Sequence, residues 1–314
     1  MSSYTKPVRK INPYIKKARK IVKRHVKHGL SKVDAAEKGL ITSVGSERGY
    51  RQGLAHYLEW AELNSVPPDS LGNKIYLKAY LEEMCECLAQ STLDQERNAL
   101  RIAYCQNLKK YISLKETLLK SRSYTMLQIL QIVKYQTLKN YICTYLAFLC
   151  GLRAHEFGTL APFELRKESS RRKWDSRRFS GLPLHKLYTV IGKGGLIRLV
   201  AVPLWLSVML EKHRRIEPIF VVDREVKYLS FYDISFGKKW SQSFSRASSR
   251  AIGSSRGGHG LRHSYAKWRL HVLIDHFKTL YPKMSNRKVL AIAHLLISQE
   301  LGHFRPSITS TYMR

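Results

Sequence analysis

Residues 259–263 read HGLRH, residues 301–303 read LGH, and a tyrosine, Tyr312, lies nine residues after the second motif. Together these side chains offer what phosphodiester chemistry needs. An arginine presents a planar fork of donors that matches phosphate oxygens. A histidine exchanges a proton near neutral pH, and a tyrosine oxygen can become covalently attached to phosphorus. With Arg153 and Lys193 upstream, the set predicts breakage of a DNA strand without a metal.

The chain carries a large excess of positive charge. It has 314 residues, with 55 Lys and Arg against 23 Asp and Glu, so its formal net charge is +32 at pH 7. Such a field favours polyanions, most simply nucleic acid, through phosphate contacts and counterion release. An anionic membrane or an acidic protein is the alternative partner. Because 44% of the residues are hydrophobic, the chain can fill real cores, which excludes a disordered tail protein.

The sequence gives no sign of export or of a membrane anchor. The longest apolar stretch, 141–152, is too short and too interrupted to span a bilayer, and the N-terminus lacks the apolar segment of a secretory signal. The five cysteines are an odd number without disulfide spacing, and Cys85 and Cys87 have no second pair that would complete a zinc site. We therefore expect a cytoplasmic protein, associated with the nucleoid if DNA is its partner.

Two segments are expected before the motifs. Residues 1–30 hold ten Lys or Arg and no acid. We interpret them as a basic N-terminal arm that becomes ordered on DNA, rather than as a basic helix. Residues 31–120 show helical periodicity and predict a domain of four or five helices. Within it, Ser91 and Asp94 resemble the capping start of one helix.

The remaining residues, 121–314, predict a domain that mixes helices with a small sheet. Helices are expected at about 126–135 and 137–150, the second almost wholly apolar and therefore buried. Runs rich in β-branched residues at 187–191 and 196–202 flank a Gly-Lys-Gly-Gly sequence, a pattern that predicts a hairpin with glycines in its turn.

Basic residues outside the motifs are the expected DNA contacts, because such side chains mostly position a protein on phosphates. They lie in the arm and in an expected loop at 166–178. The candidates are Lys16, Lys17, Arg19, Lys20, Lys23, Arg24, Arg171, Arg172 and Lys173.

Each motif residue also has an ordinary interpretation. Arg153 could bond carbonyls at a helix end, Lys193 could be a solvated turn residue, and Tyr312 is one of eighteen tyrosines. A zinc site on His259 and His263 is disfavoured, because glycine stands where the metalloprotease motif has glutamate. His263 is therefore expected to be a structural histidine with its hydrogen bonds satisfied.

Taken in order, five motifs resemble those of the tyrosine recombinase (phage integrase) family. They are Gly-Leu-Arg153-x-x-Glu156, Gly-Lys193-Gly-Gly, His259-x-Leu-Arg262-His263, Leu-Gly-His303 and Tyr312. The resemblance implies a mainly α catalytic domain with a small β-sheet (α+β), preceded by an all-α, SAM-like core-binding domain. In this family the two domains form a C-shaped clamp around duplex DNA.

The resemblance also implies a reaction that uses neither a metal nor ATP. Arg153 and Arg262 would hold the non-bridging phosphate oxygens and stabilise the charge of the transition state. Tyr312 would attack the phosphorus and leave a 3′-phosphotyrosyl link and a free 5′-hydroxyl. No cofactor is expected, because the arginines supply the positive charge that Mg²⁺ would otherwise bring.

The other motif residues would move protons or orient groups. By the same resemblance, Lys193 would be the general acid toward the departing 5′ oxygen, and His259 would assist proton transfer from the tyrosine. His303 would bond a phosphate oxygen, and Glu156 would orient its neighbours.

The implied function is site-specific recombination of duplex DNA, with integration or excision of a mobile element as the expected role. The expected assembly is a homo-tetramer on DNA, with accessory DNA-bending proteins as possible partners. A type IB topoisomerase has nearly the same catalytic set, and a non-catalytic DNA-binding protein of the same fold is a third interpretation.

Three features depart from the family pattern. Only two residues follow Tyr312, whereas family members continue into a helix that packs on a neighbouring protomer. Either assembly uses other contacts or the chain is shortened, and Tyr312 is expected to be mobile until DNA binds. The interval from Arg262 to His303 is long, so an extra helix or loop is expected around 271–290. The interval from Arg153 to Lys193 is also long and holds the basic loop.

Overall fold

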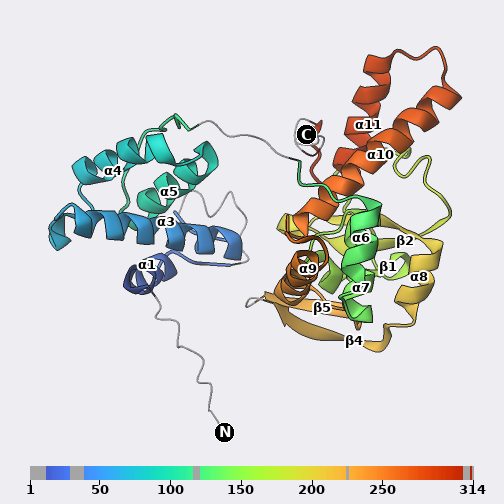
Figure 1. Cartoon of the computed structure of the whole chain (residues 1–314), viewed down its shortest axis with the longest axis horizontal. Helices are drawn as coiled ribbons and strands as arrows, with labels where there is room; N and C mark the ends of the chain where they lie inside the picture. The colour runs from blue at the N-terminus through green and yellow to red at the C-terminus, as the bar shows by residue number, and fades with distance from the viewer. Residues whose placement is uncertain (1–11, 29–38, 116–120, 224–225, 307–311, 313–314) are drawn as a thin grey trace, which may run out of the picture. The chain divides into compact units, whose positions relative to one another are not determined.

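A computed structural model describes residues 12–28, 39–115, 121–223, 226–306 and 312 of the chain. The chain divides into two compact units, Met1–Leu118 and Leu119–Arg314, which are described separately (Figure 1).

The regular elements of unit 1 are helices, beside one isolated β-bridge between Val26 and Ile41. Its α-helices are α1 (Pro13–Lys23), α3 (Val44–Leu63), α4 (Lys74–Cys87) and α5 (Gln90–Ala103), with a short 3-10 turn η1 (Pro68–Ser70) before α4. Apolar side chains from all four helices share one core, with Leu54, Leu77 and Leu100 completely buried at its centre. The expected capping of α5 by Ser91 is wrong. The helix begins at Gln90, so Ser91 is its second residue, and its cap Ala89 offers no side-chain hydrogen bond.

The expected arm is wrong for Pro13–Lys23, which form helix α1. Its N-terminus is capped by Asn12, whose side-chain oxygen accepts a hydrogen bond of 2.9 Å from the backbone N–H of Tyr14. Ala18 and Val22 are buried in the core of unit 1, and α1 packs on α3. The apolar stripe of the helix is what fixes it there. The rest of the expected arm, residues 1–11 and 29–30, lies outside the described residues.

Unit 2 mixes helices with two small antiparallel sheets, as the α+β prediction requires. Its α-helices are α6 (Met126–Val133), α7 (Leu138–Cys150), α8 (Leu204–Glu211), α9 (Gly237–Ile252), α10 (His259–Leu280) and α11 (Asn286–Glu300). Strands β1 (Ala161–Pro162), β2 (His185–Ile191) and β3 (Ile197–Pro203) form one sheet in that order, and β4 (Arg214–Asp223) pairs with β5 (Val226–Tyr232) in the other.

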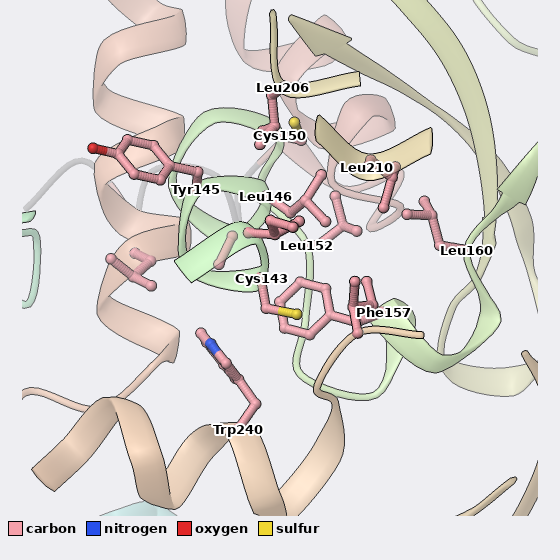
Figure 2. Close-up of a cluster of buried hydrophobic side chains, with 14 of the residues drawn as sticks. Cys143, Tyr145, Leu146, Cys150, Leu152, Phe157, Leu160, Leu206, Leu210 and Trp240 are labelled. Carbon is pink, nitrogen blue, oxygen red and sulfur yellow. The ribbon is translucent and has the colours of Figure 1, made fainter. Parts of the chain in front are cut away.

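Helix α7 lies at the centre of unit 2, as its apolar sequence predicts. Figure 2 shows Leu146 and Cys150 of α7 beside Leu206 of α8, and Trp240 of α9 near Cys143. Most side chains of α7 are buried, so a helix without a polar face is stable here. This packing holds the C-terminal end of α7 rigidly, which matters because the first motif follows it directly.

The expected hairpin is confirmed. Strands β2 and β3 pair in continuous register from His185↔Pro203 to Ile191↔Ile197. The turn between them contains a 3-10 segment, η4 (Lys193–Gly195).

Within the described stretch 226–306, no separate helix or long loop forms at 271–290, so that expectation is wrong. The added length instead extends α10 to Leu280, and a short turn leads into α11 at Asn286. The two helices pack along each other as a long hairpin (Figure 1). Their shared core includes Leu273, Leu296 and the side chain of Tyr312.

Candidate active site

Arg153 is placed by the end of α7. The helix terminates at Gly151, whose φ of 64° is a left-handed conformation that favours glycine. A Cβ at this position would also lie 2.6 Å from the ring of Tyr265 on α10. The chain then turns so that both the backbone N–H and the guanidinium Nη1 of Arg153 donate to the carboxylate of Glu156, each at 2.8 Å. The guanidinium thus binds a carboxylate rather than the carbonyl groups of the helix end.

Glu156 is completely buried and has a second cationic partner, Arg198 of β3. The Nη2 of Arg198 donates to Oε2 of Glu156 at 2.7 Å, and its Nη1 donates to the backbone oxygen of Glu300 at 2.6 Å. Burial alone would raise the pKa of Glu156, but the guanidiniums of Arg198 and Arg153 outweigh it and hold that pKa well below its usual range. Glu156 is therefore an ionised group that orients both arginines.

Arg198 was missed at the level of sequence. It interrupts the apolar run Ile197–Pro203 of β3 and is only 1% exposed. A charged residue inside an apolar strand is rarely buried without a partner, so its position was a usable signal.

Arg262 lies in the first turn of α10 and is completely buried. Its guanidinium donates to the backbone oxygens of Gly151 and Leu301, and its Nη2 lies 3.2 Å from Nε2 of His303. Its Nε has no hydrogen-bond partner in the part of the chain that the structure describes. Burial, and then the positive charge of Arg153, lower the pKa of Arg262 to about 9. This is a buried cation with unused donor capacity.

Tyr312 is held against His303. The turn after α11 has Gly302 at φ 70°, and the backbone N–H of His303 donates to the carbonyl of Ser298 at 2.7 Å. Nε2 of His303 then lies 3.0 Å from the hydroxyl of Tyr312, whose side chain is 5% exposed. The structure thus shows this side chain docked against His303, and its mobility before DNA binds stays a prediction.

The two histidines of α10 flank the tyrosine ring. The ring centroid of His263 lies 4.5 Å from that of Tyr312, and the ring centroid of His259 lies 5.7 Å from it. The expectation that all hydrogen bonds of His263 are satisfied is wrong for one atom, because Nδ1 has no partner among the described residues. His263 instead forms one wall of the tyrosine site. His259 is exposed.

Both His303 and His263 are held neutral. Burial, and then the charges of Arg262 and Arg153, lower the pKa of His303 to about 3. Burial, followed by the charge of Arg122, lowers the pKa of His263. Near neutral pH these rings therefore accept or donate a hydrogen bond without adding charge.

Lys193 stands in the hairpin turn beside this site. The turn is closed by a hydrogen bond of 2.7 Å from the N–H of Gly192 to the carbonyl of Leu196. A Cβ at Gly192 would lie 3.3 Å from Oε1 of Glu156. The backbone before Lys193 therefore passes directly over the Arg153–Glu156 pair, while the side chain of Lys193 lies outside what the structure describes.

The candidate DNA contacts are exposed, which suits their expected role. On α1 they are Lys16, Lys17, Arg19, Lys20 and Lys23, with Arg24 at its C-terminal cap; in the basic loop they are Arg171, Arg172 and Lys173. The ends of the expected loop differ. Arg166 is half-buried and bonds Thr189 in β2, and Arg178 pairs with Glu168. Arg166 fastens the start of the loop to β2, whereas Arg178 pairs with a carboxylate of the loop itself.

Within the described ranges, no group of three or more His, Cys, Asp or Glu side chains is arranged to hold a metal ion. The five cysteines are free thiols. None of the helices seen there has the length and apolar character that crossing a membrane requires.

Among known proteins, only solved structures show a similarity to this chain. No protein-family model and no curated protein matches the sequence. Among solved structures, the chain is similar to the XerH site-specific recombinase bound to palindromic difH substrate in a post-cleavage complex. The TM-score is 0.51 and the identity 15%, over 96% of this chain and 91% of that one.

A second similar structure is the Tn1549 transposon integrase in complex with transposon right end DNA. Here the TM-score is 0.51 and the identity 14%, over 95% of this chain and 94% of the other. At such identities the likeness concerns the fold. The chain has the fold of the tyrosine recombinases, which confirms the resemblance that its motifs predicted.

Proposed function

We propose that this chain is a site-specific DNA recombinase that cuts and rejoins duplex DNA through a covalent link to Tyr312. The observation that carries the proposal is the environment of Arg262. This cation is completely buried, and among the described residues no carboxylate lies within ion-pair distance of it. Burying an unpaired charge is costly unless a ligand pairs with it. A phosphodiester is a fitting ligand, because its oxygens match the guanidinium donors.

The nearby charges support the same ligand. Arg153, Arg198 and Arg262 surround one carboxylate, Glu156. An added anion with one negative charge would bring the local balance closer to neutrality. Its non-bridging oxygens would accept from Arg262 and Arg153, which would stabilise the transition state as negative charge grows on them.

The proposed strand cleavage is a transesterification. The oxygen of Tyr312 attacks the phosphorus, a tyrosyl–phosphorus bond forms, and the bond from phosphorus to the 5′ oxygen breaks. The leaving 5′ oxygen takes a proton, for which Lys193 is the proposed donor. Rejoining reverses these steps with a 5′-hydroxyl from another strand. No bond energy is lost, so no ATP is consumed.

His303 is the better candidate than His259 for accepting the proton of Tyr312. A guanidinium can only donate hydrogen bonds. Because Nη2 of Arg262 lies 3.2 Å from Nε2 of His303, this nitrogen must be the acceptor, with the ring proton on the other nitrogen. The same Nε2 is 3.0 Å from the tyrosine hydroxyl. We therefore assign proton acceptance to His303 and leave His259, which is exposed, to contact the phosphate.

Duplex DNA at a defined site is the proposed substrate, and the solved structures of XerH and the Tn1549 integrase are complexes with DNA. The exposed basic residues of α1 and of the loop would bind the sugar–phosphate backbone. A C-shaped clamp, a homo-tetramer on DNA, accessory DNA-bending proteins, integration or excision of a mobile element and a cytoplasmic, nucleoid-associated location belong to the same proposal.

Covalent capture tests the function. Duplexes that the protein binds are first selected from a random-sequence pool. The selected site is then synthesised with a nick near its centre, so that cleavage by the protein releases a short fragment, rejoining is prevented and the covalent adduct accumulates. Wild-type protein and Tyr281→Phe, which alters an exposed tyrosine (51% exposed), should form a denaturant-resistant adduct, and Tyr312→Phe should not.

Two results would overturn the proposal. One is the absence of an adduct from wild-type protein on the DNA it selects. The other is relaxation of supercoiled plasmids of any sequence with no strand exchange between selected sites, which would identify a type IB topoisomerase.

A further inference from the structure

The turn that carries His303 has an unusual backbone. Phe304, the next residue, has φ 54°, and Gly302 before it has φ 70°. Glycine adopts a left-handed conformation freely, whereas phenylalanine does so only under strain. Strained non-glycine residues persist when surrounding contacts hold them, and they gather at functional sites. The contacts of Phe304 therefore decide where His303 points.

Those contacts come from the basic loop. The ring centroid of Phe304 lies 4.6 Å from that of Trp174, and the guanidinium carbon of Arg172 lies 5.3 Å from the Phe304 ring centroid. Trp174 is itself covered by Arg178, whose guanidinium carbon is 4.3 Å from its ring centroid. Its indole N–H donates to the carbonyl of Ser169 at 2.9 Å. Phe304 is thus held by an aromatic side chain that is fixed on both sides.

The loop is also tied to the helix that precedes the turn. The backbone N–H of Asp175 donates to the side-chain oxygen of Gln299 at 2.8 Å. The N–H of Phe179 donates to Oε1 of Glu300 at 3.1 Å, and at its other end Ser169 donates to the carbonyl of Ile197 in β3 at 3.0 Å. The first two bonds join the loop to the last turn of α11 and the third joins it to β3, so the loop that carries Trp174 is held next to the turn that carries His303.

We propose that Trp174 and Arg172 are positioning residues, which hold Phe304 and thereby fix His303 against the hydroxyl of Tyr312. This inference rests on the proposed function. It gives the insertion between Arg153 and Lys193 a second task besides binding phosphates. Since the loop carries exposed Arg171 and Lys173 beside Arg172, its contact with DNA and its support of the active site occur in the same segment.

If the basic loop contributed only positive charge, its variants would give a different pattern of cleavage rates. Trp174 would then be dispensable, and Arg171→Gln and Arg172→Gln would have the same effect, since each removes one exposed cation. A positioning loop predicts instead that Arg172→Gln lowers the rate of the chemical step more than Arg171→Gln does. Both changes should weaken DNA binding.

Single-turnover cleavage of the captured duplex, at saturating protein, measures the chemical step separately from binding. Trp174→Ala should slow adduct formation by about 10- to 100-fold, since small misplacements of a reacting group cost this much. Trp174→Phe, which keeps an aromatic ring on Phe304, should restore most of the rate. Trp205→Ala, which truncates an exposed tryptophan on α8 (47% exposed), is the matched control and should cleave like wild type.

A double-mutant cycle with His303 makes the test specific. If Trp174 acts through His303, then Trp174→Ala should have little further effect in a His303→Ala background, because the group it positions is already gone. If Trp174→Ala instead slowed cleavage through a general structural defect, its fold-reduction in rate would multiply with that of His303→Ala. Multiplicative effects, or equal rates for Trp174→Ala and Trp174→Phe, would overturn the proposal.

Failure of this inference and failure of the proposed function give different results. No adduct from wild-type protein removes the function. A normal wild-type adduct with an unchanged rate in Trp174→Ala removes only the positioning role. Thermal unfolding of each variant identifies any that fail to fold, in which case Trp174→Leu and Phe304→Leu provide the comparison.

Discussion

Replacing Glu156 by glutamine should destabilise unit 2 strongly. The change keeps the shape of the side chain but removes the one carboxylate that Arg153 and Arg198 share, at 2.8 and 2.7 Å. Because Glu156 is 0% exposed, water cannot replace it. Breaking a buried ion pair from one side costs about 3–5 kcal/mol. With a melting shift of about 2–4 °C per kcal/mol for a domain of this size, the expected loss is on the order of 10 °C.

A matched control is Glu168→Gln. Glu168 also pairs with an arginine, Arg178, at 2.9 Å, but its side chain is 26% exposed. Partly exposed pairs of this kind contribute about 0.2–1 kcal/mol. Differential scanning calorimetry at pH 7 should therefore show a large shift for Glu156→Gln and a small one for Glu168→Gln. Equal shifts would refute the view that Glu156 is the counter-ion on which the arginine cluster depends.

The pH dependence adds a second measurement on the same variant. The pKa of Glu156 is lower in the folded protein than in the unfolded chain. Its contribution to stability is therefore fully present above the unfolded value and is lost as the pH falls toward the folded value. Wild-type protein should lose stability below about pH 4.3. The Glu156→Gln variant should have a shallower slope in that acidic range, and an unchanged slope would contradict the assignment.

Three further predictions follow from the charges. The pKa of His303 is about 3 in the folded protein and about 6.5 in the unfolded chain. Between these values only the unfolded chain binds the proton, so the free energy of unfolding should fall as the pH drops below about 6.5. In urea titrations, His303→Gln should make this pH dependence shallower. Sulfate should raise the melting temperature of wild-type protein more than that of Arg262→Gln at equal ionic strength, because a bound anion pairs with the buried guanidinium. Replacing Lys16, Lys20 and Lys23 by glutamine should make the plot of log K for DNA against log salt less steep by about 0.9 for each phosphate contact removed.

The motif residues of the site could be predicted from sequence because the chemistry requires particular side chains at particular intervals. Arg262 and His303, far apart in the chain, do come together. The buried α7 followed from its apolar composition, and the hairpin from two β-branched runs that flank a glycine-rich turn. Helix α1 was missed because its lysines dominated the interpretation, although Ala18 and Val22 already had the spacing of a buried stripe.

Other elements gave weaker signals. Helix α9 is rich in serine and basic residues, and Trp240 and Phe244 are the only large side chains it buries, so its low apolar content concealed it rather than a lack of periodicity. Strand β4 is mostly exposed and contains Pro218, which a strand-pattern search penalises. The role of Trp174 depends on a contact with Phe304, 130 residues further along the chain, and no local pattern encodes such a pair.

Because the side chain of Tyr312 is already docked, we infer that the charges around its hydroxyl, rather than its position, control the proposed cleavage. Its hydroxyl lies beside His303, but burial, and then the charges of Arg262 and Arg153, lower the pKa of that histidine to about 3 and make it a poor base. A phosphate bound between the two guanidiniums would offset their positive charge, and the pKa of His303 would rise toward its ordinary value. The substrate would therefore create the base that its own cleavage needs. On the proposed function, His303 becomes an effective base only when a phosphodiester occupies the arginine cluster.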